Sequence, residues 1–183
     1  APVSLYGATK LASETLILEY GACFDFPVWI NRCGVLAGAG QFGKADQGIF
    51  SYWIHSFREK NLLKYIGFNG TGHQVRDALH PQDLVPLLSR QILEPGWEAP
   101  KIINLGGGLE NSMSLKELSI WCEERFGSNE IIPSDEVRPM DAPWIVMDST
   151  TAQNAWNWNV EIKIEDILNE IAQHAEENAK WLE

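Results

Sequence analysis

Apolar residues along the chain follow two spacings, one typical of helices and one typical of strands. The segment 4–20 carries leucines at helical spacing, with Ser4 as a candidate N-cap and Gly21 as a candidate stop. The same reasoning predicts further helices over residues 49–60, 81–93, 114–126, 149–156 and 163–183. Short runs rich in strand-forming residues predict strands over residues 26–33, 62–68, 74–80 and 101–108.

Because helices and strands alternate, the pattern predicts an α/β or mixed α+β fold. A chain of 183 residues that is 45% hydrophobic can fill one core, or one core and a small lobe. Its net charge of −11 disfavours a general nucleic-acid binder, which needs a basic face. We therefore expect a globular protein with no nucleic-acid partner.

Cysteine and histidine residues give no sign of a metal or disulfide site. The three cysteines are widely separated and form no C-x-x-C pair, and the four histidines show no ligand spacing. Cysteine usage of this kind fits a reducing compartment, and we expect a cytoplasmic location. No apolar run reaches the roughly 18 residues that a membrane span needs, so no membrane association is expected.

The stretch GAGQFG, residues 38–43, matches the dinucleotide fingerprint G-x-G-x-x-G. A working fingerprint needs a helix that begins at the glycines and an acidic residue at the end of the next strand. Here the expected helix begins several residues later, and the next strand ends in Gly67, Phe68 and Asn69. Two other interpretations remain: a flexible loop, or a ligand-binding loop at a strand end.

Tyr6 and Lys10 stand four residues apart, so both lie on one face of the first expected helix. A nearby ammonium group favours the phenolate form of tyrosine, which can then exchange protons with a substrate hydroxyl. The alternative is an ordinary helix surface that happens to carry one tyrosine and one lysine.

Longer motifs around this pair resemble a known family. APVSLYGATKLASE resembles the Y-x-x-x-K helix of the extended short-chain dehydrogenase/reductases, the NAD(P)-dependent nucleotide-sugar epimerases and dehydratases. GTGHQVRDALHPQDLV, INLGGGLENSMSLKEL and VRPMD with VMDSTTAQNAWNW resemble later segments of that family, in the same order. Within the family, AGAGQFGKADQGIFSYWI is similar to the loop of the 2-epimerases that act on CDP-linked sugars, which implies that GAGQFG is a substrate loop.

The resemblance implies NAD as cofactor and a reaction in which a sugar is transiently oxidised. Tyr6 would be the acid–base group on the sugar hydroxyl, and Lys10 would support it and hydrogen-bond the nicotinamide ribose. Cys33 and Gly34 would lie near the nicotinamide; the alternative for Cys33, and the commoner role of such a cysteine, is a small core residue.

The substrate implied is a nucleotide-diphosphate sugar. Gln41, Asp46 and Gln47 would line its pocket, the alternative being a solvated glycine loop. Arg76 and Arg138 would clamp the diphosphate, because guanidinium groups pair bidentately with phosphate oxygens. The alternative for each arginine is a surface salt bridge.

The family order also implies an organisation of the chain. Residues 1–45 would be the tail of a cofactor domain, and residues 46–183 a substrate-binding lobe. The fingerprint and the catalytic Ser or Thr precede the Y-x-x-x-K helix in this family, so we expect the C-terminal portion of a longer enzyme, inactive alone. Alternatives are a 4-epimerase, a 4,6-dehydratase or a non-catalytic nucleotide-binding member, and the complete protein is a possible homodimer.

Overall fold

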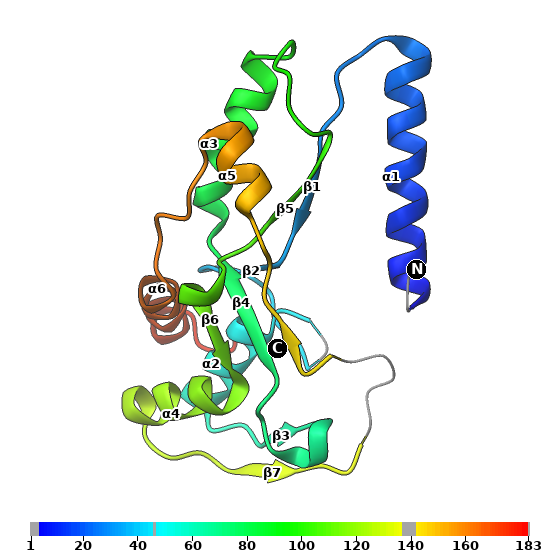
Figure 1. Ribbon diagram of the computed structural model, residues 1–183. Coiled ribbons are helices and arrows are strands. Elements are labelled where there is room, and N and C mark those ends of the chain that lie inside the picture. Colours follow the sequence, from blue (N-terminus) through cyan, green and yellow to red (C-terminus); the bar gives the residue numbers. More distant parts are fainter. Residues whose placement is uncertain (1–3, 46, 137–141, 183) are drawn as a thin grey trace.

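The computed structural model describes residues 4–45, 47–136 and 142–182 (Figure 1). The helices are α1 (Leu5–Phe24), α2 (Ile49–Glu59), α3 (Pro81–Leu93), α4 (Leu115–Phe126), α5 (Thr150–Trp156) and α6 (Ile164–Glu177), with 3-10 turns at Phe68–Gly70 and Leu109–Asn111. The strands are β1 (Ile30–Cys33), β2 (Val35–Leu36), β3 (Leu63–Tyr65), β4 (Val75–Leu79), β5 (Ile102–Leu105), β6 (Ser112–Ser114), β7 (Ile131–Pro133) and β8 (Trp144–Ile145). These elements confirm the mixed α/β class.

Within the residues that the structure describes, the strands form three small sheets. β1 pairs in parallel with β5, with Ile30 opposite Ile102 and Cys33 opposite Leu105. β4 pairs in parallel with β2 and β8 and antiparallel with β6, while β3 and β7 form a separate parallel pair. Parallel pairs need long crossover connections, and helices supply most of them here. The β4 sheet joins the two ends of the molecule in Figure 1.

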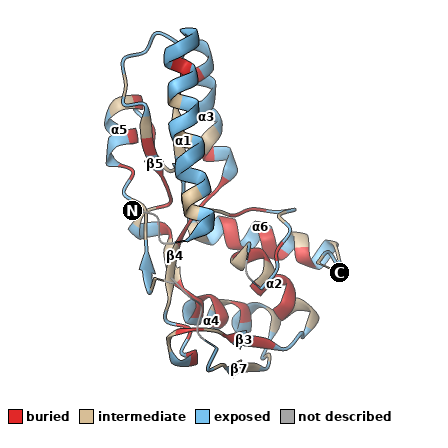
Figure 2. Cartoon of the chain, turned by 90° about the vertical axis from the view of Figure 1, so that its right-hand side faces the viewer, coloured by how far each residue is buried: buried red, intermediate tan, exposed pale blue. Residues whose placement is uncertain are grey.

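Two hydrophobic cores of the described residues share β4: Ala78 belongs to one, and the next residue, Leu79, belongs to the other. The strand-pair core fills the space between the β1–β5 pair and helices α3 and α5, where Trp29 meets the Trp156 ring edge-on at 5.5 Å. The helical core lies among α2, α4, α6 and β3. Buried residues gather in these two places in Figure 2. Both cores draw on segments far apart in the sequence, and a domain boundary at residue 45 stays a prediction.

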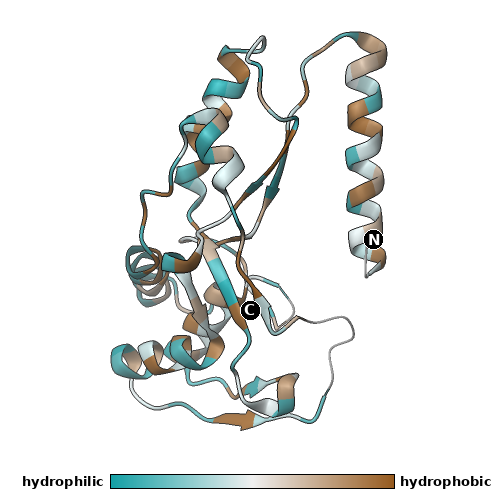
Figure 3. Cartoon of the chain, viewed as in Figure 1, coloured by the Kyte–Doolittle hydropathy of each residue, from teal (hydrophilic) through white to brown (hydrophobic). Residues whose placement is uncertain are grey.

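Helix α1 stands to one side of the strands, and its surface is largely exposed (Figures 1 and 2). Among its described residues only Gly21 is buried. Large apolar side chains such as Leu5 and Phe24 face solvent, and Figure 3 shows brown, hydrophobic positions along the whole helix. Arg32 joins β1 to α1 through a bidentate contact with Glu14, and this hydrogen bonding lowers the pKa of the Glu14 carboxyl. The exposed face of α1 is a surface on which another element can pack.

The sequence predicts both ends of α1, at Ser4 and at Gly21, and the structure confirms the first of them. Ser4 caps the helix as expected, since its hydroxyl accepts from the Gly7 amide. Gly21 is not the stop: the helix continues to Phe24, and Asp25 ends it in the left-handed conformation. A Cβ at Gly21 would lie 2.6 Å from a methyl of Val28. Glycine stands there because the returning chain packs against the helix, not because the helix ends.

Helix α4 carries the expected capping box. The Ser114 hydroxyl accepts from the Glu117 amide, and the Glu117 carboxylate accepts from the Ser114 amide at 2.7 Å. This hydrogen bond from the Ser114 amide lowers the pKa of Glu117. Gly127 ends the helix as the sequence predicts. Local signals of this kind fix a helix end without help from the rest of the fold.

The glycines after β5 allow its end to pass directly against β4. A Cβ at Gly107 would collide with the backbone carbonyl oxygen of Ala78, which cannot rotate away. We expect Gly107→Ala to lower the free energy of unfolding by about 1–3 kcal/mol, measured by urea denaturation. Gly96→Ala is the control, because no atom lies within 4 Å of its added methyl. Equal stability of the two variants would contradict this account.

Within the described residues, no helix is both long and apolar enough to cross a bilayer.

Candidate substrate-binding site

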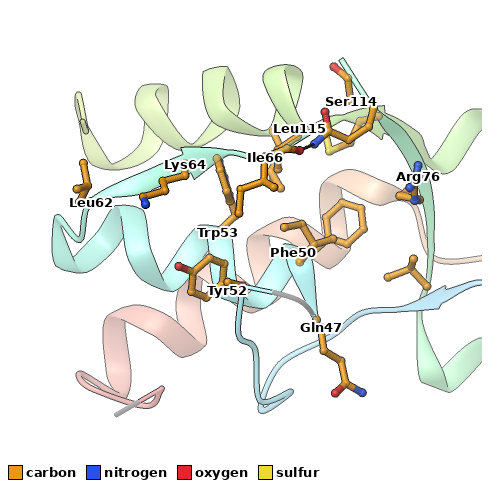
Figure 4. Close-up of a pocket in the computed structure, with 17 residues that line it drawn as sticks. Gln47, Phe50, Tyr52, Trp53, Leu62, Lys64, Ile66, Arg76, Ser114 and Leu115 are labelled. Carbon is orange, nitrogen blue, oxygen red and sulfur yellow. Dashed lines mark hydrogen bonds between the residues drawn. The ribbon is translucent and has the colours of Figure 1, made fainter. Parts of the chain in front are cut away.

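A cavity of about 350 Å³ opens between α2, β3, β4 and the start of α4 (Figure 4). Apolar and aromatic side chains make most of its wall, and a few polar ones stand among them. The lining residues that Figure 4 labels are Gln47, Phe50, Tyr52, Trp53, Leu62, Lys64, Ile66, Arg76, Ser114 and Leu115. An apolar pocket of this size with a few polar groups is the usual form of a small-molecule site.

Beneath the aromatic wall lies a buried hydrogen-bond network. Trp53 stacks on Tyr65 with ring centroids 5.6 Å apart. The indole N–H of Trp53 and the hydroxyl of Tyr65 both donate to the Ser119 hydroxyl, at 2.9 and 2.7 Å. Ser119 in turn donates to the Leu115 carbonyl, and burial raises the pKa of Tyr65. One serine thus fixes two aromatic rings, one of which lines the cavity.

Two cationic side chains reach the cavity from different strands. Figure 4 shows Lys64 on β3 and Arg76 on β4 at opposite sides of Trp53 and Phe50. Arg76 is half-buried and donates to the Val75 carbonyl at 2.7 Å. Lys64 lies 3.9 Å from a carboxylate oxygen of Glu136, and both of these side chains are well exposed. The cavity therefore combines apolar walls with positive charge at its edges, which suits an anionic ligand.

The GAGQFG loop leads from β2 to the cavity without forming a dinucleotide fingerprint. Helix α2 begins only at Ile49, after the Gly48 N-cap. A Cβ at Gly43 would lie 2.5 Å from the Tyr52 amide nitrogen, so that glycine serves close packing against α2. The sequence-based objection to the fingerprint is confirmed: no helix begins at these glycines.

Side chains from two helices and the loop itself hold this loop in place. The Gln41 side-chain amide donates to the Leu36 carbonyl at 2.7 Å, and Ser51 donates to the Gln41 carbonyl. The Glu170 carboxylate on α6 accepts from the Ala39 amide at 3.1 Å and contacts His80 at 2.9 Å. The loop is thus tied to the elements around the cavity.

The residues expected to bind substrate occupy different places. Arg76 and Gln47 line the cavity, although Gln47 is exposed and extends away from Phe50 in Figure 4. Gln41 is not among the lining residues, and its amide supports the loop instead. Asp46 and Arg138 lie outside the described residues.

The expected catalytic pair lies elsewhere, on α1. Tyr6 and Lys10 share one face as predicted, with the Lys10 ammonium nitrogen 5.5 Å from the centre of the Tyr6 ring. Tyr6 is 72% exposed. Neither residue lines the cavity, and Figure 1 shows α1 apart from the strands that form it.

Cys33 and Gly34, expected near the nicotinamide, follow one another at the end of β1. Cys33 is exposed, and partial burial of its sulfur raises the pKa of the thiol. A Cβ at Gly34 would lie 2.9 Å from Met147 and 3.3 Å from Asp77, so glycine is needed there for packing. Among the residues that the structure describes, no group of three potential metal ligands gathers.

Sequence reasoning missed several residues of the cavity wall. Trp53 was expected in an amphipathic helix and in the loop motif, Lys64 in a strand, and Gln74 at the start of the next strand. Their common site depends on how α2, β3 and β4 pack together, and no local spacing reveals that. The available signals were the motifs AGAGQFGKADQGIFSYWI, which contains Trp53, and GTGHQVRDALHPQDLV, which contains Gln74 and Arg76.

Comparisons with known proteins agree with this fold. Residues 1–106 match the NAD dependent epimerase/dehydratase family. The chain is 29% identical over 169 residues to CDP-paratose 2-epimerase of Salmonella typhi, covering 89% of this chain and 49% of that protein. It is 27% identical over 173 residues to UDP-glucose 4-epimerase of Corynebacterium glutamicum, covering 87% and 50%. The chain thus spans about half the length of these curated relatives.

Solved structures show the same architecture. UDP-glucuronic acid 4-epimerase from Bacillus cereus, in complex with UDP-glucuronic acid and NAD, aligns with a TM-score of 0.79 at 23% identity, over 97% of this chain and 54% of that one. UDP-glucose 4-epimerase from Thermotoga maritima, with UDP-glucose, aligns with a TM-score of 0.79 at 17% identity, over 97% and 55%. The family match covers more than half of the sequence, and this chain belongs to the NAD-dependent epimerase/dehydratase family.

Proposed function

We propose that the chain forms the substrate-binding part of an NAD-dependent nucleotide-sugar epimerase whose substrate is CDP-linked. The observation that carries the proposal is the cavity of about 350 Å³, with aromatic walls and Arg76 at its edge. A pyrimidine base suits the apolar wall, and a diphosphate suits the guanidinium group. The similarity to CDP-paratose 2-epimerase supports cytidine as the nucleoside.

The residues of α1 would supply the acid–base chemistry. Tyr6 exchanges a proton between its phenol oxygen and a sugar hydroxyl, and the Lys10 ammonium beside the ring stabilises the phenolate. NAD, when bound, supplies the acceptor and donor of hydride. Because the exposed Tyr6–Lys10 face is accessible, it fits the nicotinamide-ribose end of that cofactor.

Among the described residues, the GAGQFG loop lacks the arrangement that binds the pyrophosphate of a dinucleotide. No helix begins at Gly38, Gly40 or Gly43, so these glycines offer no helix N-terminus to a pyrophosphate. Cys33 and Gly34 at the end of β1 are proposed to lie beside the nicotinamide. We propose that a segment beyond this chain completes the catalytic centre and that the chain alone is inactive.

Titration calorimetry with CDP, UDP and NAD⁺, each added separately to the chain, tests the proposal. We expect CDP to bind, and NAD⁺ to give no measurable heat, because no helix begins at the glycines of GAGQFG. A preference for UDP would favour a UDP-sugar 4-epimerase, in line with the similarity to UDP-glucose 4-epimerase. Absence of binding by either nucleotide would contradict the assignment of the cavity.

Arg76→Ala is expected to weaken CDP binding about 10- to 100-fold, because hydrogen bonds to a charged group contribute about 1.5–3 kcal/mol. Arg125→Ala is the matched control: Arg125 is an exposed arginine on α4 that pairs with Glu176. Calorimetry measures both affinities, and melting temperatures show whether loss of the Arg76–Val75 contact has altered folding. Unchanged affinity in a folded Arg76→Ala protein would exclude Arg76 from the diphosphate site.

A further inference from the structure

Gln74 brings an amide side chain to the cavity just before β4 begins. Its side-chain nitrogen donates to the Ile66 carbonyl at 3.4 Å. Its side-chain oxygen is buried and has no hydrogen-bond partner among the described residues. A buried acceptor without a donor is unfavourable and is rare in native proteins, so this atom calls for a functional explanation.

The orientation of the Gln74 amide follows from its neighbour. Amide nitrogen and oxygen are assigned from the hydrogen bonds they make. The Ile66 carbonyl can only accept, so the NH₂ group must face it, and the oxygen remains as an acceptor. At 3.4 Å this bond is long. The oxygen is buried in this arrangement and reaches a ligand in the cavity when the side chain rotates.

Three other polar residues of the wall are unsuited to the same role. Ser114 is already engaged with Glu117 through its hydroxyl, while Lys64 and Arg76 offer only donors. Among the buried side-chain polar atoms without a partner in the described structure, the Gln74 oxygen is the one whose residue lines this cavity. Gln47, which is exposed, and Tyr52, which is half-buried, bring further side-chain oxygens to the wall.

The place of Gln74 along the strand suits a base. Gln74 and Arg76 are two residues apart, so their side chains leave the same face about 7 Å from each other. A nucleoside diphosphate has a base at one end and a diphosphate at the other, with the ribose between. With the diphosphate on Arg76, the base lies beside Gln74, against Ile66 and Leu115.

We propose that Gln74 determines base specificity by accepting a hydrogen bond from the 4-amino group of cytosine, an inference that rests on the proposed function. Cytosine carries an amino donor at ring position 4, whereas uracil carries a carbonyl acceptor there. An acceptor facing the cytosine amino group gains a hydrogen bond, and one facing the uracil carbonyl stays unpaired. The site thus selects CDP-linked over UDP-linked substrates.

Calorimetric titration of the chain with CDP, UDP and the diphosphate of 2-pyrimidinone riboside, which lacks the 4-amino group, tests this inference. We expect CDP to bind at least tenfold more tightly than either of the others. In Gln74→Leu, which keeps the size of the side chain but removes the amide, the three affinities should converge. Gln173→Leu is the control, because Gln173 is an exposed glutamine on α6 bonded to Glu177.

The outcomes separate the two proposals. If the wild-type chain binds none of the three nucleotides, the proposed function fails and this inference falls with it. If CDP and UDP bind equally well, or if Gln74→Leu keeps the full CDP preference, the nucleotide site stands and the role of Gln74 is wrong. The pyrimidinone nucleotide tests the amino group on the wild-type protein, so a folding defect in the variant cannot mask the answer.

Discussion

Replacing Tyr6 by phenylalanine in the complete protein is expected to lower kcat by about 10²- to 10⁴-fold, the range typical of losing a general acid–base group. The substitution keeps the ring and removes only the phenol oxygen that would exchange the proton. Because Tyr6 is 72% exposed, the free energy of unfolding should change by less than about 0.5 kcal/mol. Steady-state turnover of the nucleotide sugar and urea denaturation measure the two effects.

Tyr20→Phe is the matched control for this prediction. Tyr20 lies on the same helix, is also exposed, and stacks on Phe24 with ring centroids 5.6 Å apart. It has no proposed part in proton transfer, so its loss should leave kcat unchanged. Wild-type turnover in Tyr6→Phe, or an equal loss in Tyr20→Phe, would refute the assignment of Tyr6.

Ser119→Ala is expected to lower the free energy of unfolding by about 2–6 kcal/mol. The substitution removes the shared acceptor of Trp53 and Tyr65, and each buried donor left unpaired costs about 1–3 kcal/mol. The Ser119 side chain lies in a closed core, where water cannot easily replace it. Urea denaturation followed by tryptophan fluorescence measures the loss.

Ser128→Ala serves as the control for Ser119→Ala, since Ser128 is exposed just beyond the end of α4. Its effect should stay within about 0.5 kcal/mol. A Tyr65→Phe, Ser119→Ala double variant should lose less than the sum of its parts, because one unpaired donor is then absent. Equal stability of Ser119→Ala and wild type would show that the network does not hold the aromatic wall.

The proposed catalytic pair lies on α1, an exposed helix that is separate from the cavity. Tyr6 and Lys10 lie on a helix whose only buried described residue is Gly21. Figure 3 marks hydrophobic positions along this helix, and several of its large apolar side chains are exposed in the described structure. Packing by a segment of the complete protein would bury them, and dimerisation through α1 stays a prediction.

The presence of the helices and most of their end residues can be predicted from the residues nearby in the sequence. Ser4 and the Ser114–Glu117 capping box set where α1 and α4 begin, because each satisfies amides within its own first turn. Gly21 misled the sequence reading because glycine serves two purposes, ending helices and allowing close contact. Val28, seven residues further along, decides which purpose applies here.

The sequence by itself determined the α/β class, the order of the helices and of strands β1, β3, β4 and β5, the shared face of Tyr6 and Lys10, and the family. These features depend on periodicity and ordered motifs. The tertiary structure alone decided the cavity. Trp53, Ile66 and Gln74 meet only because α2, β3 and β4 pack around one space. The unpaired oxygen of Gln74 is equally a property of that packing, since whether an amide finds a partner depends on neighbours that the local sequence does not specify.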